Sequence, residues 1–245
     1  MNNQKAQFPL VITTNLDVLV ASFGGVGTSF LMHFLKQYRR INCPHNMDGF
    51  KHTSIPPLTL TPNLKAIYIY GDPIKATASL FRRNYHHAHA RTITGKTLPK
   101  NMTLEEYATQ LEDCFQFENH YYNWRNRDTA YPILFIKYNA IWESIDAIFD
   151  FLELPSNLKS KFPAKKKRQS SIESSPQSII NDLNQLYGKF KEEVEKSPDF
   201  EIKPSKSFSY IKKLPLIPRS LLVNQQTVYP KLVLNSFFRK KTVNN

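Results

Sequence analysis

Three short apolar runs, each followed by a turn and then by apolar residues at helical spacing, constrain the fold of this chain most strongly. The runs lie at residues 17–23, 66–70 and 133–138. Short apolar runs bounded by turn residues are typical of buried strands. Strands that alternate with helices favour a parallel sheet with right-handed crossovers and helices on both faces. We therefore predict an α/β fold with three layers around a central parallel sheet.

Helices are predicted after each of these strands. One begins at Thr28, and the next follows a turn in which Asp72 is the cap and Pro73 takes the first helical position, reaching about Tyr85. A capping box at residues 103–106 begins a long helix that is predicted to reach about Trp124. Further helices are predicted over residues 141–152 and from residue 176 onward.

The whole chain, residues 1–245, is expected to form a single domain. Residues 1–15 read as a polar arm and residues 203–245 as an irregular basic segment. The chain contains 41% apolar residues and is long enough to bury a sizeable core. It has no run of about 18 apolar residues, so no transmembrane segment is expected. Two cysteines exclude a disulfide-dense scaffold and, without an evident secretory signal, favour a cytoplasmic location.

The charge balance points to anionic partners. The chain has 33 Lys and Arg residues against 20 Asp and Glu residues, which gives a formal net charge of +13. Such a chain favours nucleic acid, a phosphorylated cofactor, an acidic glycan or an anionic membrane. The alternative explanation is that the positive charge only keeps the chain soluble. No motif for a specific nucleic acid is found, so no such partner is predicted.

The segment from Ser22 to Ser29, SFGGVGTS, follows a predicted strand and opens a predicted helix. Backbone N–H groups in this position can surround a phosphate, and small residues let the anion approach the backbone. We therefore name Gly25, Val26, Gly27 and the hydroxyls of Thr28 and Ser29 as candidate anion-binding residues. The segment lacks the lysine of a Walker A motif, and a plain glycine turn between strand and helix is the alternative interpretation.

Three segments together resemble the sulfotransferase family. The family's 5′-phosphosulfate loop, Ser-Tyr/Phe-Pro-Lys-Ser-Gly-Thr-Thr-Trp-Leu, is similar to residues 22–31, SFGGVGTSFL. The family's 3′-phosphate segment has Arg-Asp-Pro after a strand and a serine eight residues beyond the arginine, and residues 66–81 resemble it. A third resemblance covers residues 131–155, which end in FLELP where the family commonly closes with Phe-Leu-Gly-(Leu/Val)-Pro.

The resemblance implies a P-loop-type α/β fold and the cofactor 3′-phosphoadenosine 5′-phosphosulfate (PAPS). It also implies transfer of a sulfuryl group to a hydroxyl or amine of a glycan or small molecule. Two departures remove positive charge from the implied site. Gly25 stands where the family has its loop lysine, and Gly71 stands where the family has the arginine that contacts the 3′-phosphate. The alternative function is therefore a degenerate family member that binds nucleotide, glycan or an acidic partner without catalysis.

Lys51 and His52 are the candidate catalytic residues. They lie in the segment FKHTSIPP, which is similar to the Lys-Thr-His-Leu-Pro segment of cytosolic sulfotransferases, whose histidine is the base. In this chain the lysine and histidine are adjacent instead of separated by one residue. Lys51 would replace the missing loop cation if its segment folds over the loop, and a lysine introduced at Gly25 should then partly rescue loss of Lys51. A solvated loop pair is the alternative interpretation.

Candidates for the 3′-phosphate contact lie on the helix after Pro73. Arg82 and Arg83 are three and four residues beyond Ser79, so all three can share a helix face. Arg168, in the basic run at residues 165–168, is a further candidate for closing over the nucleotide. Solvated surface positions are the alternative interpretation for each of them.

A metal site is not predicted. His86, His87 and His89 are neighbours in sequence, and neighbouring histidines on a regular helix do not converge on one ion. They remain secondary candidates for the base. The sequence does not define the acceptor or the oligomeric state.

Overall fold

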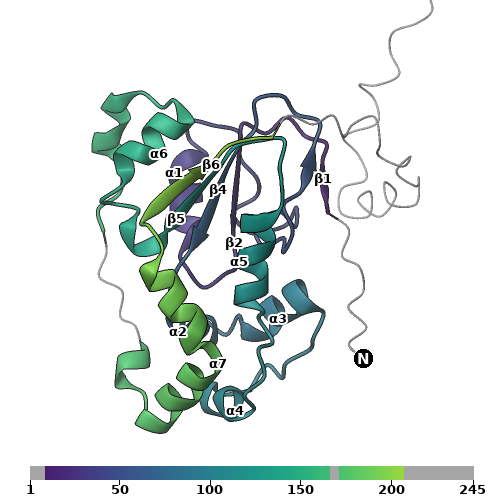
Figure 1. Ribbon diagram of the computed structural model, residues 1–245, viewed down its shortest axis with the longest axis vertical. Coiled ribbons are helices and arrows are strands. Elements are labelled where there is room, and N and C mark those ends of the chain that lie inside the picture. The colour runs from purple at the N-terminus through teal and green to yellow at the C-terminus, as the bar shows by residue number, and fades with distance from the viewer. Residues whose placement is uncertain (1–8, 166–170, 207–245) are drawn as a thin grey trace, which may run out of the picture. The chain divides into compact units, whose positions relative to one another are not determined.

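The computed structural model describes residues 9–165 and 171–206 (Figure 1). The chain divides into two units, residues 1–206 and 207–245, and the described residues all belong to the first. Most of the predicted C-terminal segment and the position of Arg168 therefore lie outside the described residues. The strands are β1 (Val11–Ile12), β2 (Val18–Ser22), β3 (Leu58–Thr59), β4 (Lys65–Tyr70), β5 (Ile133–Lys137) and β6 (Phe200–Lys203). The α-helices are α1 (Thr28–Leu35), α2 (Pro73–Arg82), α3 (His86–Thr94), α4 (Leu104–Thr109), α5 (Phe117–Asn126), α6 (Ile145–Leu152) and α7 (Gln177–Lys196).

The main sheet has four strands in the order β2-β4-β5-β6. β2, β4 and β5 are parallel, and β6 joins the edge of β5 in the antiparallel direction. The register places Ala21 beside Tyr68, and Tyr68 beside Phe135. All residues of β2 and β5 are buried, as expected of strands covered on both faces. The predicted α/β fold is therefore confirmed, and its central sheet is parallel except for β6.

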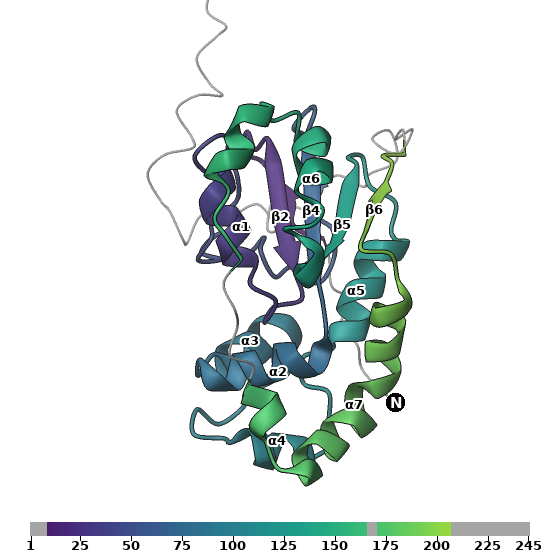
Figure 2. The same cartoon turned by 90° about the vertical axis from the view of Figure 1, so that its left-hand side faces the viewer.

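Helices cover both faces of this sheet. α1 and α6 lie on one face and α5 lies on the other (Figure 1). A ring contact joins α1 to α6 on their shared face, with the centroids of Phe34 and Phe149 6.0 Å apart, and another joins β4 to α5, with the centroids of Tyr68 and Trp124 5.1 Å apart. α2, α3, α4 and α7 gather beyond the carboxyl ends of the parallel strands (Figure 2). This arrangement puts the loop after β2 and the start of α2 at the same end of the sheet.

The predicted long helix over residues 104–124 is wrong. The chain forms two helices there, α4 and α5, because Leu111 and Gln116 adopt positive φ angles of 49° and 48°. The Asp113 carboxylate accepts hydrogen bonds from the N–H groups of Phe115 and Gln116, which satisfies the backbone where the helix is interrupted. The continuous apolar stripe thus reflects two helices that pack on one core.

The amino-terminal arm also differs from the prediction. Residues 11 and 12 form β1, which pairs with β3 in a separate parallel ladder. Ile12 is fully buried in the core, so burial of one side chain holds this strand in place although the segment is mostly polar. Neither α3 nor β6 was predicted. None of the helices in the described parts of the chain is long and apolar enough to span a bilayer.

The segment that carries the catalytic candidates runs beside the outer edge of β2. The Asn42 side chain accepts a hydrogen bond from Val20 N–H at 2.8 Å and donates one to the Val20 carbonyl at 3.0 Å. This buried amide pairs with the backbone of Val20 on the side of β2 that has no neighbouring strand in the sheet. Farther along, Ser22 N–H donates to the carbonyl of Lys51 at 3.0 Å. These hydrogen bonds along the edge of β2 therefore place residues 51 and 52 at the carboxyl end of that strand.

Candidate functional site

The loop after β2 has a backbone that requires glycine. Gly24, Gly25 and Gly27 have φ angles of +94°, +71° and +71°, and Gly27 precedes α1 in the left-handed conformation. Side chains other than glycine rarely adopt such angles. No side chain caps the amino terminus of α1. The first N–H groups of the helix therefore keep the capacity to bind an anion, and the helix dipole favours negative charge there.

Ser22 and Thr28 close this loop at its base. The Thr28 hydroxyl donates to Ser22 Oγ at 2.7 Å, and Gly24 N–H donates to the same oxygen at 3.3 Å. Both hydroxyl residues are buried. Thr28 was predicted to donate to an anion, but its proton is used inside the loop. Thr28 therefore supports the loop conformation, and its hydroxyl proton is not directed to a ligand.

Lys51 places a cation beside the first turn of α1. Its side chain is buried, and Nζ donates to Ser29 Oγ at 2.7 Å and to the Pro44 carbonyl at 2.7 Å. Burial, with a smaller contribution from the charge of Arg83, lowers the pKa of Lys51 to about 8. Since Ser29 Oγ accepts from the amine, its own proton remains available to a ligand. The structure thus brings Lys51 to the loop from which the family's lysine is missing.

His52 lies beside Lys51 and contacts the end of β2. Its Nδ1 is 3.0 Å from the Ser22 carbonyl oxygen and 3.4 Å from Ser22 Oγ. A carbonyl only accepts, so Nδ1 carries the proton and Nε2 holds a lone pair. Burial, and then the neighbouring His89, lower the pKa of His52 well below its ordinary value. The ring is therefore neutral at pH 7, in the tautomer that can accept a proton.

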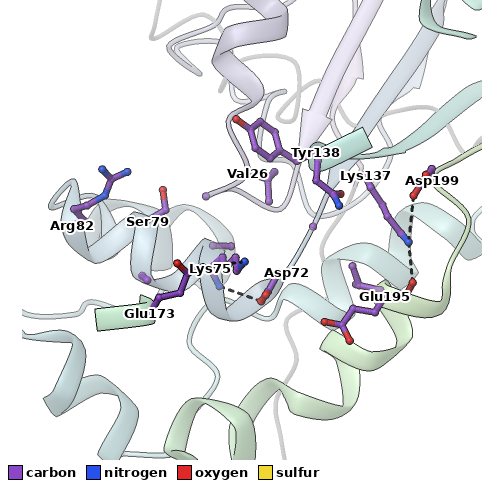
Figure 3. Close-up of a pocket in the computed structure, with 16 residues that line it drawn as sticks. Val26, Asp72, Lys75, Ser79, Arg82, Lys137, Tyr138, Glu173, Glu195 and Asp199 are labelled. Carbon is purple, nitrogen blue, oxygen red and sulfur yellow. Dashed lines mark hydrogen bonds and ion pairs between the residues drawn. The ribbon is translucent and has the colours of Figure 1, made fainter. Parts of the chain in front are cut away.

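A cavity of about 570 Å³ borders the loop at Val26 and does not include Lys51 or His52 in its wall (Figure 3). It is lined by Gly25 and Val26 of the loop, by α2 from Lys75 to Arg82, by the end of β5, and by the end of α7. This volume is in the range of small-molecule sites. Such a position, beyond the carboxyl ends of parallel strands, is where α/β proteins bind ligands.

Ser79 and Arg82 both line the cavity and project from α2 to the same side (Figure 3). Arg82 makes no ion pair or hydrogen bond with any residue that the structure describes. Arg83 does not line the cavity. Its Nε donates to the Ser79 carbonyl at 3.0 Å, and its guanidinium lies 5.5 Å from the ring centroid of Tyr85. The shared helix face predicted for the three residues therefore does not place Arg83 with the other two.

The cavity wall carries charges of both signs, three cations and four carboxylates. Each carboxylate has a partner. Asp72 accepts hydrogen bonds from the N–H groups of Ile74 and Lys75. The other three form ion pairs: Glu173 with Lys75 at 3.6 Å, Glu195 with Lys191 at 2.8 Å, and Asp199 with Lys137 at 3.8 Å. Lys137 is buried and also donates to two carbonyls, those of Glu195 and Ser197. These partners leave Arg82 as the cation with the most capacity to bind an added anion.

The two glycines that replace family cations differ in the space around them. A Cβ at Gly25 would lie 2.6 Å from the backbone oxygen of Ala76, and its φ of +71° disfavours any side chain. A Cβ at Gly71 would lie 3.4 Å from Val26 Cγ1 and 3.7 Å from Tyr138 Cβ, which are ordinary contacts. The expectation that a lysine at position 25 would rescue loss of Lys51 is therefore wrong, because α2 fills the space. Position 71 can accept a side chain beside the cavity.

The other histidines serve separate contacts. On α3, His86 Nε2 bonds the Pro99 carbonyl at 3.0 Å, whereas His89 Nε2 bonds the Phe23 carbonyl of the loop at 2.7 Å. His120, on α5, bonds the Tyr68 hydroxyl through Nδ1. In residues 9–165 and 171–206, no group of three or more His, Cys, Asp and Glu side chains is arranged to hold a metal ion.

Sequence reasoning missed the residues that connect these parts. Asn42 and Asn46 position the segment before Lys51, the latter by accepting a hydrogen bond from Lys51 N–H at 2.9 Å. Lys137 and α7 form part of the cavity wall. The partners of Asn42 and Lys137 are distant in sequence, so no local pattern could have identified these two residues.

A family model described as the sulfotransferase domain matches residues 35–197, a range that begins after the glycine loop. A crystal structure of mouse sulfotransferase SULT7A1 complexed with PAP is matched at 15% sequence identity, covering 76% of this chain and 86% of that one, with a TM-score of 0.39. No curated protein matches.

The match to the family model covers more than half of the chain and includes both segments that carry the candidate 3′-phosphate and catalytic residues. The described fold agrees with it, because three parallel strands carry the loop, α2 and the cavity at one end of the sheet. This chain therefore belongs to the sulfotransferase domain family.

Proposed function

We propose that this protein is a PAPS-dependent sulfotransferase that acts on a hydroxyl or amine of a glycan or small molecule. The observation that carries the proposal is the contact of Lys51 Nζ with Ser29 Oγ at 2.7 Å. It supplies a cation at the anion-binding loop although Gly25 has replaced the family's lysine. His52, the adjacent residue, has its Nε2 lone pair available for a proton.

The residues of the cavity fit the phosphorylated nucleotide. Gly25 and Val26 of the loop line the cavity, the first turn of α1 follows them without a side-chain cap from Gly27, and Ser79 and Arg82 offer a hydroxyl and a guanidinium farther along the cavity. We assign the 5′ end of PAPS to the loop and the 3′-phosphate to Ser79 and Arg82. Arg83 is omitted from this assignment because it contacts backbone and Tyr85 outside the cavity.

Each catalytic candidate has one task in this proposal. Bound PAPS supplies the activated sulfuryl group, as it does for the family. Lys51 stabilises negative charge on the oxygen that leaves with the nucleotide. His52 Nε2 accepts the proton that the acceptor hydroxyl or amine loses, while its Nδ1–H stays on the Ser22 carbonyl and orients the ring. An anionic ligand nearby would raise the pKa of His52 and make it a stronger base.

Calorimetry with adenosine 3′,5′-bisphosphate and with ATP tests the binding part of the proposal. We expect the bisphosphate to bind and ATP to bind much more weakly. Transfer of labelled sulfate from PAPS to a panel of glycans and small hydroxyl compounds then tests catalysis. Binding without transfer to any member of the panel favours the alternative, a family member that binds without catalysis. Absence of bisphosphate binding overturns both.

The 3′-phosphate assignment predicts a selective effect of Arg82. Arg82→Ala should weaken binding of adenosine 3′,5′-bisphosphate about tenfold to a hundredfold, since a hydrogen bond to a charged group is worth about 1.5–3 kcal/mol. Binding of adenosine 5′-monophosphate should change little. Arg83→Ala is the matched control because the two arginines are adjacent in sequence and only Arg82 lines the cavity. Equal losses for both nucleotides, or the larger loss in the control, would contradict the assignment.

Gly71→Arg should restore the family's contact. The geometry at position 71 accepts a Cβ, and its neighbours Val26 and Tyr138 both line the cavity. We expect a gain of about tenfold in bisphosphate affinity and little change for the monophosphate, measured by calorimetry. Gly71→Leu, which adds volume without charge, is the control. A gain for both nucleotides alike would show that the arginine does not act on the 3′-phosphate.

A further inference from the structure

His89 of α3 is packed against the glycine loop so closely that the two require each other. A Cβ at Gly24 would lie 2.2 Å from His89 Cε1 and 2.4 Å from its Nε2, so the imidazole occupies the place of a side chain at this position. Gly24 also has a φ of +94°. Only glycine therefore permits both the loop conformation and the approach of this ring.

The contact is directional as well as close. His89 Nε2 donates to the Phe23 carbonyl oxygen at 2.7 Å, across 66 residues of sequence. On the other side of the same peptide unit, Gly24 N–H donates to Ser22 Oγ at 3.3 Å. The peptide between Phe23 and Gly24 is therefore held at both its oxygen and its nitrogen, which fixes how the loop turns toward α1. Burial lowers the pKa of His89 to about 4, so the ring is neutral at physiological pH.

A second imidazole holds the preceding carbonyl. His52 Nδ1 contacts the Ser22 carbonyl oxygen at 3.0 Å, so two successive carbonyls of the chain each accept from a histidine. The two rings are 5.0 Å apart between centroids and nearly perpendicular, at 88°. His89 thus contacts both the anion-binding loop and the candidate base, and it comes from an element that neither of them belongs to.

We infer that His89 is a positioning residue, which holds the Phe23–Gly24 peptide and the ring of His52 in the geometry that nucleotide binding and proton transfer need. The effect of His89 on activity rests on the proposed function. Its effect on the conformation of the loop does not depend on that function. Loss of the Nε2 donor would leave a buried carbonyl unpaired and release the peptide to rotate. The backbone of the loop would then no longer be held in one conformation.

Substitutions of different side-chain length can distinguish the hydrogen bond donated by His89 Nε2 from the packing of the ring. In glutamine the amide nitrogen can reach the place of Nε2, whereas in asparagine it corresponds to Nδ1 and is too short. We expect His89→Gln to keep bisphosphate affinity within about threefold of the unmodified protein, and His89→Asn and His89→Leu to lower it about tenfold or more. Hydrogen exchange of the amides in residues 22–30, measured without ligand, should accelerate in the asparagine and leucine variants and stay slow in the glutamine variant.

His86→Leu is the matched control. His86 lies three residues before His89 on the same helix, is 2% exposed against 6% for His89, and also donates Nε2 to a carbonyl, that of Pro99. It should lower thermal stability without changing loop exchange or bisphosphate affinity. Equal affinity and exchange for the glutamine and asparagine variants, or a loop effect of the control as large as that of His89→Leu, would overturn the inference. If the unmodified protein fails to bind bisphosphate, the proposed function fails, and the exchange measurements still decide the role of His89.

Discussion

His52→Ala is expected to lower the rate of sulfuryl transfer about a hundredfold or more while leaving binding of adenosine 3′,5′-bisphosphate nearly intact. The size follows from the usual contribution of a general base. Binding should persist because His52 does not line the cavity to which we assign the nucleotide. The measurement is transfer of labelled sulfate from PAPS to an acceptor identified in the panel, alongside calorimetry with the bisphosphate.

A second substitution separates the base from the structural contact of the same ring. In His52→Asn the side-chain amide can still donate to the Ser22 carbonyl, as Nδ1 does now at 3.0 Å, but no basic nitrogen remains. We expect the asparagine variant to lose as much activity as the alanine variant and to keep a higher melting temperature. His45→Ala, an exposed histidine in the same segment, is the control. Normal turnover in either His52 variant would mean that the base lies elsewhere.

Lys51→Met is expected to lower turnover about a hundredfold to a thousandfold, the range found when one preorganised electrostatic group is removed. Methionine keeps much of the aliphatic volume of the buried side chain but cannot donate to Ser29. Affinity for the bisphosphate should also fall, because a cation beside the loop stabilises the anion in the ground state as well. Lys36→Met, an exposed lysine just after α1, is the control and should have little effect. Adding Gly25→Lys to Lys51→Met should not restore activity, because α2 occupies the space at position 25.

The lowered pKa of Lys51 gives this prediction a pH dependence. Burial lowers that pKa to about 8, and an amine is charged below its pKa. The electrostatic contribution of Lys51 is therefore present at pH 7 and is lost as the pH rises through about 8. We expect kcat/KM for PAPS to fall above pH 8 in the unmodified protein and to lack this fall in Lys51→Met. The same alkaline fall in both proteins would assign it to another group.

Local patterns were sufficient to predict the three parallel strands and the turns that follow them. The runs at residues 17–23, 66–70 and 133–138 became β2, β4 and β5, because a strand covered on both faces must be apolar throughout. The glycines at 24, 25 and 27 were likewise readable as a loop that precedes a helix. The helix predicted over residues 104–124 failed, since an apolar stripe reports which side chains are buried but not whether the backbone between them is continuous.

The sequence by itself determined which elements form and which residues carry suitable chemistry, because periodic burial and glycine conformation are local properties. Only the tertiary structure decided which of these residues meet. Asn42 directs its segment along the edge of β2 and thereby brings Lys51 to Ser29, and α3 brings His89 to the peptide before Gly24. The same packing turned Arg83 away from the cavity that Arg82 lines. Such contacts depend on the path of the chain between distant residues and on the volume left by α2 and α3, and neither is encoded in any short stretch of sequence.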